Sequence, residues 1–320
     1  MTKTIAVIDA DIVAYRCAAA AETRSIKAVH ITTGQEIKCA HRTSLKEQIK
    51  DTFEIGEFEI IDVQTPEDIA NAIHAMNTCV DAFKKSCKAD KVELYISGKD
   101  NFRDSLPLPS KYKGNRTGLR PLHLAKCRDY LIKNGAEVIN GSEVDDMLAQ
   151  RCYEGMKSRD KVIAVTNDGD QNGVEGWMYN WTKQFEPKLI KGLGEIHLTE
   201  NRKDFDGYGR KFFYAQWVYG DWNVDRFKPA ELSKKSFGVV ALHKLLENCK
   251  TDRECVEAVY KQFKSWYPAE VVYNDWTGKQ HTTDAIGLMD LYAACAHMLR
   301  FDGDVFDTRA LLTKLQIEHD

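Results

Sequence analysis

The sequence predicts an α/β protein whose core is a parallel sheet with helices on both faces. Short runs rich in β-branched residues alternate with segments of helical period through about the first 180 residues. This alternation is typical of parallel strands that are joined by helices. After about residue 205 the pattern changes to helices joined by short loops. We therefore expect a sheet-based region over residues 1–204 and a mostly helical region over residues 205–320.

Four apolar runs are the expected strands of the sheet, because each is short and rich in β-branched residues. The runs are TIAVID (4–9), VELYIS (92–97), EVIN (137–140) and VIAVT (162–166). The helical segments between them cover residues 11–22, 66–89 and 143–156. A further segment, KAVHITTGQEIKCA (27–40), has two alternating runs around Thr33 and Gly34 and predicts a hairpin insertion.

The second region is predicted from four segments with apolar residues at helical spacing. They are RKFFYAQWVYG (210–220), SFGVVALHKLLENC (236–249), residues 253–263 and DAIGLMDLYAACAHMLR (284–300). We find no internal repeat and no low-complexity linker, so the two regions are expected to follow each other directly.

Composition and charge narrow the class of protein. The 45 basic and 48 acidic residues nearly cancel, so binding to a polyanion would have to come from local patches. Nine cysteines include no Cys-x-x-Cys pair, which argues against a zinc site or a regular disulfide framework and favours a reducing cytoplasm. The apolar run at the N-terminus is broken by Asp9 and is too short for a signal or membrane segment. We expect a cytoplasmic protein with no membrane contact.

Acidic residues gather where the expected strands end. Parallel strands open a ligand-binding crevice at their carboxyl ends, so these side chains are expected to converge. Closely packed carboxylates repel one another unless cations neutralise them, and oxygen ligands favour Mg²⁺ or Mn²⁺. The residues concerned are Asp9, Glu143, Asp145, Asp146, Asp168 and Asp170.

Each acidic motif also has a structural explanation. In GSEVDD, Ser142 and Asp145 have the spacing of a capping box, and Asp9 could cap the helix that follows it. DGDQNG (168–173) resembles half of a calcium-binding loop, but Tyr179 stands where that loop needs a glutamate. These explanations leave open why all three acidic motifs, at Asp9, at residues 143–146 and at residues 168–170, follow expected strands.

Four motifs in order, IDADIVAYR, FRDSLPLPSKYKGNR, SEVDD and TNDGD, resemble the 5′→3′ exonuclease and flap endonuclease family. These are PIN-like nucleases, related to the N-terminal domain of bacterial DNA polymerase I. The resemblance covers about residues 4–240. It implies that the six carboxylates named above bind metal, and that Arg16, seven residues after Asp9, lies near the scissile phosphate.

The segment PSKYKGNR (109–116) gathers cations around a tyrosine. By the resemblance it lies at the base of a helical arch, within an arch segment of about residues 98–135. Tyr112 is then a stacking platform for an unpaired base, while Lys113 and Arg116 stabilise charge on the reacting phosphate. Further DNA contacts are expected from Arg103, Lys111, Lys234 and Lys235.

Two stretches depart from the family pattern. Gly98 stands where the family has an aspartate after the third strand, and Asp100 is a possible replacement. GDWNVDRFKP places Asp221 and Asp225 one residue further apart than in the family. We expect Asp221 to bind metal and leave Asp225 open.

The resemblance implies hydrolysis of phosphodiester bonds with two Mg²⁺ or Mn²⁺ ions roughly 4 Å apart. The expected substrate is DNA with a 5′ end or flap, or an RNA–DNA hybrid, in phage-type DNA replication or degradation. The protein is expected to be a monomer, in the host cytoplasm if it is phage-encoded. Two alternatives remain: a non-catalytic, structure-specific DNA-binding protein, and an RNA-cutting PIN-like nuclease.

Overall fold

The computed structural model describes residues 2–115 and 118–319. The chain forms two compact units. The sheet unit comprises Met1–Asp9, Phe83–Gly118 and Ala136–Asp320, and the insertion unit comprises Ala10–Ala82 and Leu119–Gly135. The sheet and the C-terminal helices belong to the same unit, and the domain boundary expected at residue 204 stays a prediction.

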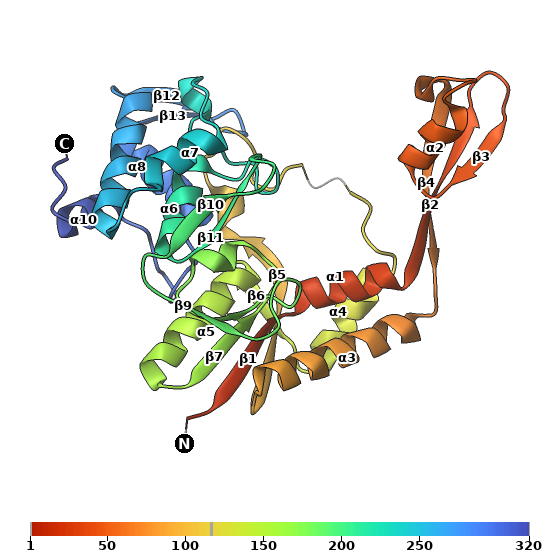
Figure 1. The fold of residues 1–320 in the computed structure, drawn as a ribbon, viewed down its shortest axis with the longest axis horizontal. Helices are drawn as coiled ribbons and strands as arrows, with labels where there is room; N and C mark the ends of the chain where they lie inside the picture. Colours follow the sequence, from red (N-terminus) through yellow and green to blue (C-terminus); the bar gives the residue numbers. More distant parts are fainter. Residues whose placement is uncertain (1, 116–117, 320) are drawn as a thin grey trace. The chain divides into compact units, whose positions relative to one another are not determined.

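The sheet unit is built on a six-stranded sheet with the order β6-β5-β1-β7-β8-β9 (Figure 1). All neighbouring strands are parallel except β9, which runs antiparallel to β8. The α/β fold with a mostly parallel sheet is therefore confirmed. The strands are β1 (Thr4–Asp9), β5 (Lys91–Asn101), β6 (Glu137–Gly141), β7 (Lys161–Val165), β8 (Gly176–Tyr179) and β9 (Lys188–Ile190).

The central strands are continuous apolar runs because both of their faces are buried. In β1, Val7 and Ile8 have no exposed surface, and neither has Ile163 in the neighbouring β7. Helix α5 (Val144–Ser158) packs on one face of the sheet through Leu148 and Cys152. This packing fixes the N-terminus of α5 relative to the strand ends, where the acidic residues lie.

The C-terminal part of the sheet unit is mostly helical, as predicted. A large apolar core surrounds Trp217, which is fully buried and donates a hydrogen bond of 2.8 Å to the Met289 carbonyl. Helix α8 begins after Thr251 because Thr251 and Glu254 form a capping box. The helices are α6 (Arg210–Tyr219), α7 (Val239–Leu246), α8 (Asp252–Trp266), α9 (Ala285–Ala296) and α10 (Thr308–Lys314). Two antiparallel pairs accompany them: β10 (Glu195–Leu198) with β11 (Phe205–Tyr208), and β12 (Val271–Asn274) with β13 (Gln280–Thr283).

The insertion unit contains the predicted hairpin and more. The hairpin of β2 (Glu22–His30) and β3 (Glu36–Cys39) is confirmed. Strand β2 also pairs along its whole length with β4 (Phe58–Pro66), which gives a three-stranded antiparallel sheet that the sequence analysis missed. Its small core includes Leu45 of α2 (Arg42–Ile49).

Three further helices belong wholly or largely to the insertion unit: α1 (Ala10–Ala20), α3 (Ile69–Cys87) and α4 (Leu124–Lys133). Helices α1 and α4 pack together, and Arg128 of α4 forms an ion pair with Asp11 of α1. Within the described part of residues 98–135, α4 is the only α-helix. Among the described residues, no helix has the length and apolar character needed to cross a membrane.

At Gly155, helix α5 lies close to Val162 of strand β7. A Cβ atom there would lie 2.9 Å from Cβ of Val162 and would also overlap its methyl group. Alanine favours a helix over glycine by about 1 kcal/mol, but overpacking costs about 1–3 kcal/mol. We expect Gly155→Ala to lower the free energy of unfolding, measured by urea denaturation. The double variant with Val162→Ala should lose less than the sum of the single losses, and simple additivity would contradict the contact.

Candidate active site

The acidic residues of β1 and β7 lie at adjoining strand ends. Ile8 of β1 pairs with Val165 of β7. Asp9 comes directly after Ile8 and Asp168 comes three residues after Val165, so both aspartates lie at the same edge of the sheet. The Asp168 amide donates to the buried hydroxyl of Thr166 at 3.0 Å, and the Asp170 amide donates to Oδ1 of Asp168 at 3.0 Å. The chain therefore turns tightly after β7 and keeps both carboxylates beside the sheet.

The third acidic motif forms the N-terminus of α5. Its capping box is one residue later than predicted: Glu143 is the N-cap, and its amide donates to Oδ2 of Asp146 at 3.0 Å. Asp145, between them in the first turn, is buried. Consecutive residues of a helix point about 100° apart, so Asp145 and Asp146 enter different surroundings.

Six acidic residues form what we call the carboxylate group: Asp9, Glu143, Asp145, Asp168, Asp170 and Asp225. Burial, followed by repulsion from Asp168 and Asp9, raises the pKa of Asp145 well above its usual range. Burial and Asp168 also raise the pKa of Asp170. Burial raises the pKa of Asp225 to about 6, while the nearby Lys113 opposes this rise. The group thus carries unfavourable negative charge that a cation would relieve.

The chemistry of this group fits a divalent cation. Oδ1 of Asp145 is buried and has no hydrogen-bond partner among the described residues, and the donors are all carboxylate oxygens, as Mg²⁺ and Mn²⁺ prefer. Within residues 2–115 and 118–319, however, no three acidic, histidine or cysteine side chains are already placed to share one ion. Binding would therefore require the side chains to move closer together.

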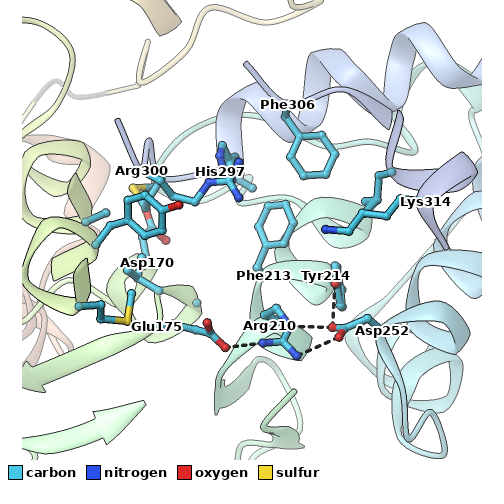
Figure 2. Close-up of a pocket in the computed structure, with 18 of the residues that line it drawn as sticks. Asp170, Glu175, Arg210, Phe213, Tyr214, Asp252, His297, Arg300, Phe306 and Lys314 are labelled. Atoms are coloured by element: carbon cyan, nitrogen blue, oxygen red, sulfur yellow. Dashed lines mark hydrogen bonds and ion pairs between the residues drawn. The ribbon is translucent and has the colours of Figure 1, made fainter. Parts of the chain in front are cut away.

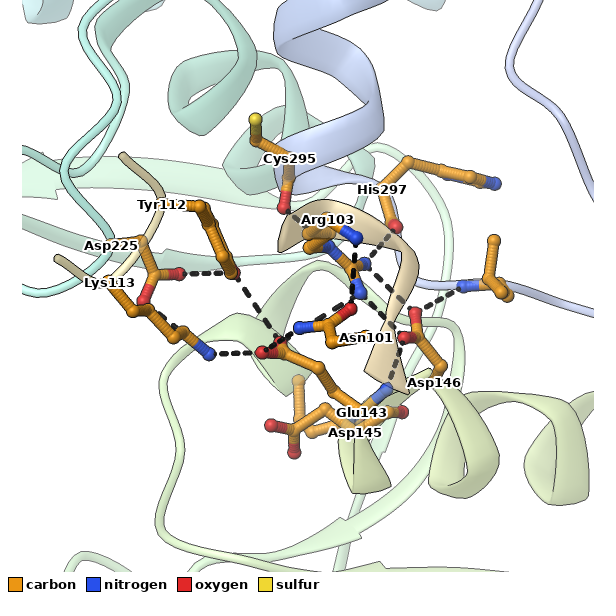
Figure 3. A network of polar contacts seen from close by, with 12 residues as sticks. Asn101, Arg103, Tyr112, Lys113, Glu143, Asp145, Asp146, Asp225, Cys295 and His297 are labelled. Carbon is orange, nitrogen blue, oxygen red and sulfur yellow. Dashed lines mark hydrogen bonds and ion pairs between the residues drawn. The ribbon is translucent and has the colours of Figure 1, made fainter. Parts of the chain in front are cut away.

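Arg103 and Asp146 form a buried ion pair (Figure 3). The sequence analysis had instead predicted a DNA contact for Arg103 and a metal-binding role for Asp146. Both side chains have no exposed surface, and the guanidinium binds both carboxylate oxygens at 2.6 and 2.9 Å. Oδ1 of Asp146 also accepts the Leu299 amide. The DNA contact predicted for Arg103 does not fit its burial, and Asp146 is fully engaged as a structural acid rather than available to a metal.

Tyr112 also differs from its predicted role. Its side chain is only 2% exposed, and its hydroxyl donates to Asp225 at 3.0 Å and lies 3.4 Å from Glu143. A buried ring cannot stack on a nucleic-acid base, so the predicted stacking platform is not Tyr112. The residue instead joins the core of the helical region to two members of the carboxylate group.

Lys113 is a cation that contacts the carboxylate group directly (Figure 3). Its ammonium pairs with Oε1 of Glu143 and lies 3.6 Å from Oδ1 of Asp225. Its backbone has a φ of 52° and its amide donates to the Asp225 carbonyl at 3.0 Å. The side chain remains 21% exposed.

The loop Asp221–Phe227 carries both aspartates of the GDWNVDRFKP stretch. It is closed by a bridge between its end residues and is not helical. Asp225 is buried beside Tyr112 and Lys113, whereas Oδ1 of Asp221 accepts the Val224 amide at 2.9 Å. Asp221 still contributes repulsion at Asp225. The structure therefore places Asp225 in the group, while a metal-binding role for Asp221 stays a prediction.

The end of β5 explains the first departure from the family pattern. A Cβ atom at Gly98 would lie 2.8 Å from the Ile139 carbonyl oxygen and would overlap the side chain of Asn140, so an aspartate does not fit there. Asp100 is exposed, with a φ of 62°. Asn101 contacts the group instead, because its amide donates to Glu143 at 2.9 Å.

The remaining predicted residues stay predictions. Lys111 is exposed, with its ammonium 5.1 Å from the centre of the Trp276 ring. Lys234 and Lys235 are exposed and precede α7, and the ammonium of Lys235 donates to the Ser265 carbonyl. Arg16 is exposed on α1 of the insertion unit. Arg116 lies outside the described residues.

Two glutamines near the site were missed by the sequence analysis. The Gln216 amide donates to Oδ1 of Asp170 at 2.5 Å, and the buried Gln171 donates to the Asp145 carbonyl at 2.7 Å. Gln216 is a buried polar residue among the apolar residues of helix α6. That polar residue within an apolar run is the sequence feature that could have indicated its role.

A separate pocket of about 480 Å³ adjoins the site through Asp170 (Figure 2). Its lining includes Arg210, Arg300 and Lys314 together with the rings of Phe213 and Phe306. Two of these cations are paired: Arg210 with Glu175 and Asp252, and Arg300 with Asp304. Because acids already neutralise most of its positive charge, we assign the chemistry to the carboxylate group.

No protein-family model matches the sequence, and no curated protein matches it. The fold, in contrast, is similar to that of a class of solved α/β proteins, the 5′-exonucleases and flap endonucleases.

The particular structure is that of a bacteriophage T5 flap endonuclease variant in a pseudo-enzyme-product complex with DNA and metal ions. It aligns with a TM-score of 0.53 and 12% identity, covering 98% of this chain and 100% of that chain. A T5 5′-exonuclease with bound zinc ions aligns with a TM-score of 0.43 and 12% identity, covering 92% of this chain and 98% of that chain. At this identity the first likeness establishes the fold alone.

The buried pair of Arg103 and Asp146 should be important for stability. We expect Arg103→Leu to lower the free energy of unfolding by about 3–5 kcal/mol, because it leaves Asp146 buried without its partner. Arg42→Leu is the matched control: Arg42 also binds both oxygens of an aspartate, Asp62, at 3.0 and 3.1 Å, but on the surface. The control should lose less than about 1 kcal/mol. Equal losses in urea denaturation would contradict this difference.

The raised pKa of Asp225 predicts a pH-dependent stability difference. The folded protein holds this proton up to about pH 6, whereas the unfolded chain releases it near pH 4. The stability contributed by the protonated acid is therefore lost as pH rises from about 4 through 6. In metal-free buffer, Asp225→Asn should match the wild type at pH 4 and exceed it at pH 7 by on the order of 2–3 kcal/mol. A constant difference across this range would contradict the assignment.

Proposed function

We propose that this protein is a divalent-metal-dependent 5′ nuclease that hydrolyses phosphodiester bonds in DNA. The observation that carries the proposal is the carboxylate group itself, at the carboxyl ends of a parallel sheet. Within it, Oδ1 of Asp145 is buried and has no hydrogen-bond partner in the described part of the chain. The similar fold of the T5 flap endonuclease, described in complex with DNA and metal ions, supports the same chemistry.

Asp145, Asp168, Asp170 and Asp9 are the residues that would hold the metal, with Asp225 and Glu143 beside them. When bound, Mg²⁺ or Mn²⁺ as a pair of ions would supply a more acidic water and neutralise charge on the phosphate. Gln216 orients Asp170, and Thr166 fixes the turn that carries Asp168. These neutral partners position the carboxylates without adding charge.

Lys113 would act on the phosphate. Its ammonium pairs with Glu143 and its side chain is partly exposed, so we expect a substrate phosphate to compete for the ammonium. A cation beside the reacting phosphate stabilises charge that develops in the transition state. Arg116 and Arg16 are proposed for the same task from the sequence alone.

The proposed substrate is DNA with a 5′ end or flap, with an RNA–DNA hybrid as a related substrate, in phage-type replication or degradation. We propose that the protein acts as a monomer. A non-catalytic DNA-binding function is the second candidate, because no three ligands are preassembled in the described residues and Lys113 already neutralises Glu143.

The decisive experiment is cleavage of a 5′-flapped duplex with Mg²⁺, with chelator and with an RNA flap in parallel. Wild-type protein should cleave the DNA only with metal. Asp145→Asn should slow cleavage by at least about a hundredfold, because it removes a charged ligand. The variant should still fold, since the change removes repulsion from Asp168 and Asp9.

Asp104→Asn is the matched control, because Asp104 is an exposed aspartate of the same unit outside the carboxylate group. It should cleave as the wild type does. DNA binding without cleavage at any metal concentration would favour the non-catalytic function. Preference for the RNA flap would favour the ribonuclease.

A further inference from the structure

The loop Asp221–Phe227 is closed by hydrogen bonds between its own residues. Its ends form an antiparallel bridge, and the Phe227 amide donates to the Asp221 carbonyl at 3.2 Å. The Val224 amide donates to Oδ1 of Asp221 at 2.9 Å, and Arg226 takes a left-handed conformation with a φ of 63°. These contacts close the loop into a compact turn with defined side-chain directions.

The turn separates its side chains into two sets. Asp225 and Phe227 are buried, with Asp225 in the carboxylate group. Trp222 and Val224 are exposed by 37% and 51%. Single exposed apolar residues are ordinary. Trp222, however, carries a large indole and lies on the same short turn as Asp225, a residue of the candidate active site.

The indole of Trp222 is paired with a cation. The guanidinium carbon of Arg226 lies 3.8 Å from the centre of the ring, a close cation–π contact. An aromatic ring beside an arginine suits single-stranded nucleic acid, because bases stack on the ring while the guanidinium attracts phosphate.

The turn is also fixed to the segment that carries Lys113. The Lys113 amide donates to the Asp225 carbonyl at 3.0 Å, and the Asn115 amide group donates to the Asn223 carbonyl at 2.7 Å. Three residues of chain span at most about 11 Å, so Trp222 stands within that backbone distance of Asp225. A strand whose phosphate lies at the carboxylate group can therefore present a nearby base to Trp222.

We propose that Trp222 and Arg226 form a stacking site for an unpaired base of the DNA strand being cut. The inference rests on the proposed nuclease function and adds the stacking platform that the buried Tyr112 does not provide. It makes an unpaired nucleotide beside the scissile phosphate part of what the protein recognises.

The test measures binding and cleavage separately. Affinity for a fluorescent 5′-flapped duplex is measured in chelator, where no cleavage occurs, and kcat and KM are measured with Mg²⁺. Trp222→Ala should weaken binding and raise KM roughly tenfold, with a smaller effect on kcat. Trp222→Phe should retain most of the affinity, because it keeps an aromatic face.

Phe301→Ala is the matched control. Phe301 is 47% exposed and has the guanidinium of Arg300 5.8 Å from its ring centre, but its loop carries no member of the carboxylate group. It should bind as the wild type does, and unchanged thermal unfolding of both variants should show that the fold is intact.

An abasic scan locates the base. Removing one base at successive positions of the flap should weaken wild-type binding roughly tenfold at the stacked position. At that position the abasic loss and the Trp222→Ala loss should not add, because both remove the same contact. If the abasic loss and the Trp222→Ala loss add fully at every position, or if Trp222→Ala binds with wild-type affinity, the stacking site is wrong. Metal-dependent cleavage by the wild type would still support the nuclease function in that case. Absence of metal-dependent cleavage by the wild type would instead refute the nuclease function.

Discussion

The buried pair of Arg103 and Asp146 holds the candidate site together. Its guanidinium binds the acid that caps α5 and also donates to the carbonyls of Cys295 and His297. One side chain thereby joins the end of β5, the start of α5 and the segment after α9. Desolvation makes such a pair costly unless every hydrogen bond is made, and here each guanidinium nitrogen has an acceptor. The direction of Glu143 and Asp145 follows from this arrangement.

The carboxylate group shows a conflict between stability and chemistry. Asp145 and Asp170 are buried next to other acids, which raises the pKa of each. A fold selected only for stability would replace such residues with apolar ones. The polar neighbours are instead arranged to hold the acids in place, with Gln216 on Asp170 and Lys113 on Glu143. Strain of this kind is expected at a site that binds cations.

The sequence predicted strands β1, β5, β6 and β7, because these runs are rich in β-branched residues and the helices between them have a clear period. It missed β8 and β9 of the same sheet, which are only four and three residues long. It also found the acidic positions after the strands. It could not assign Asp145 and Asp146 to separate tasks, because the partner of Asp146 is Arg103, 43 residues away. The burial of Tyr112 and of Asp225 likewise depends on contacts between segments far apart in the sequence. Strand β4 was missed because its alternation is interrupted by Asp62 and ends in Pro66.

The contacts of Arg103 also constrain the order in which the chain can fold. Two of its acceptors, on Cys295 and His297, are 192 and 194 residues further along the chain. During synthesis from the N-terminus, β5 and α5 emerge long before those carbonyls exist. Until they emerge, the guanidinium lacks half of its partners and its burial is unfavourable. The acidic site can therefore reach its final geometry only after residues 295–297 have been synthesised.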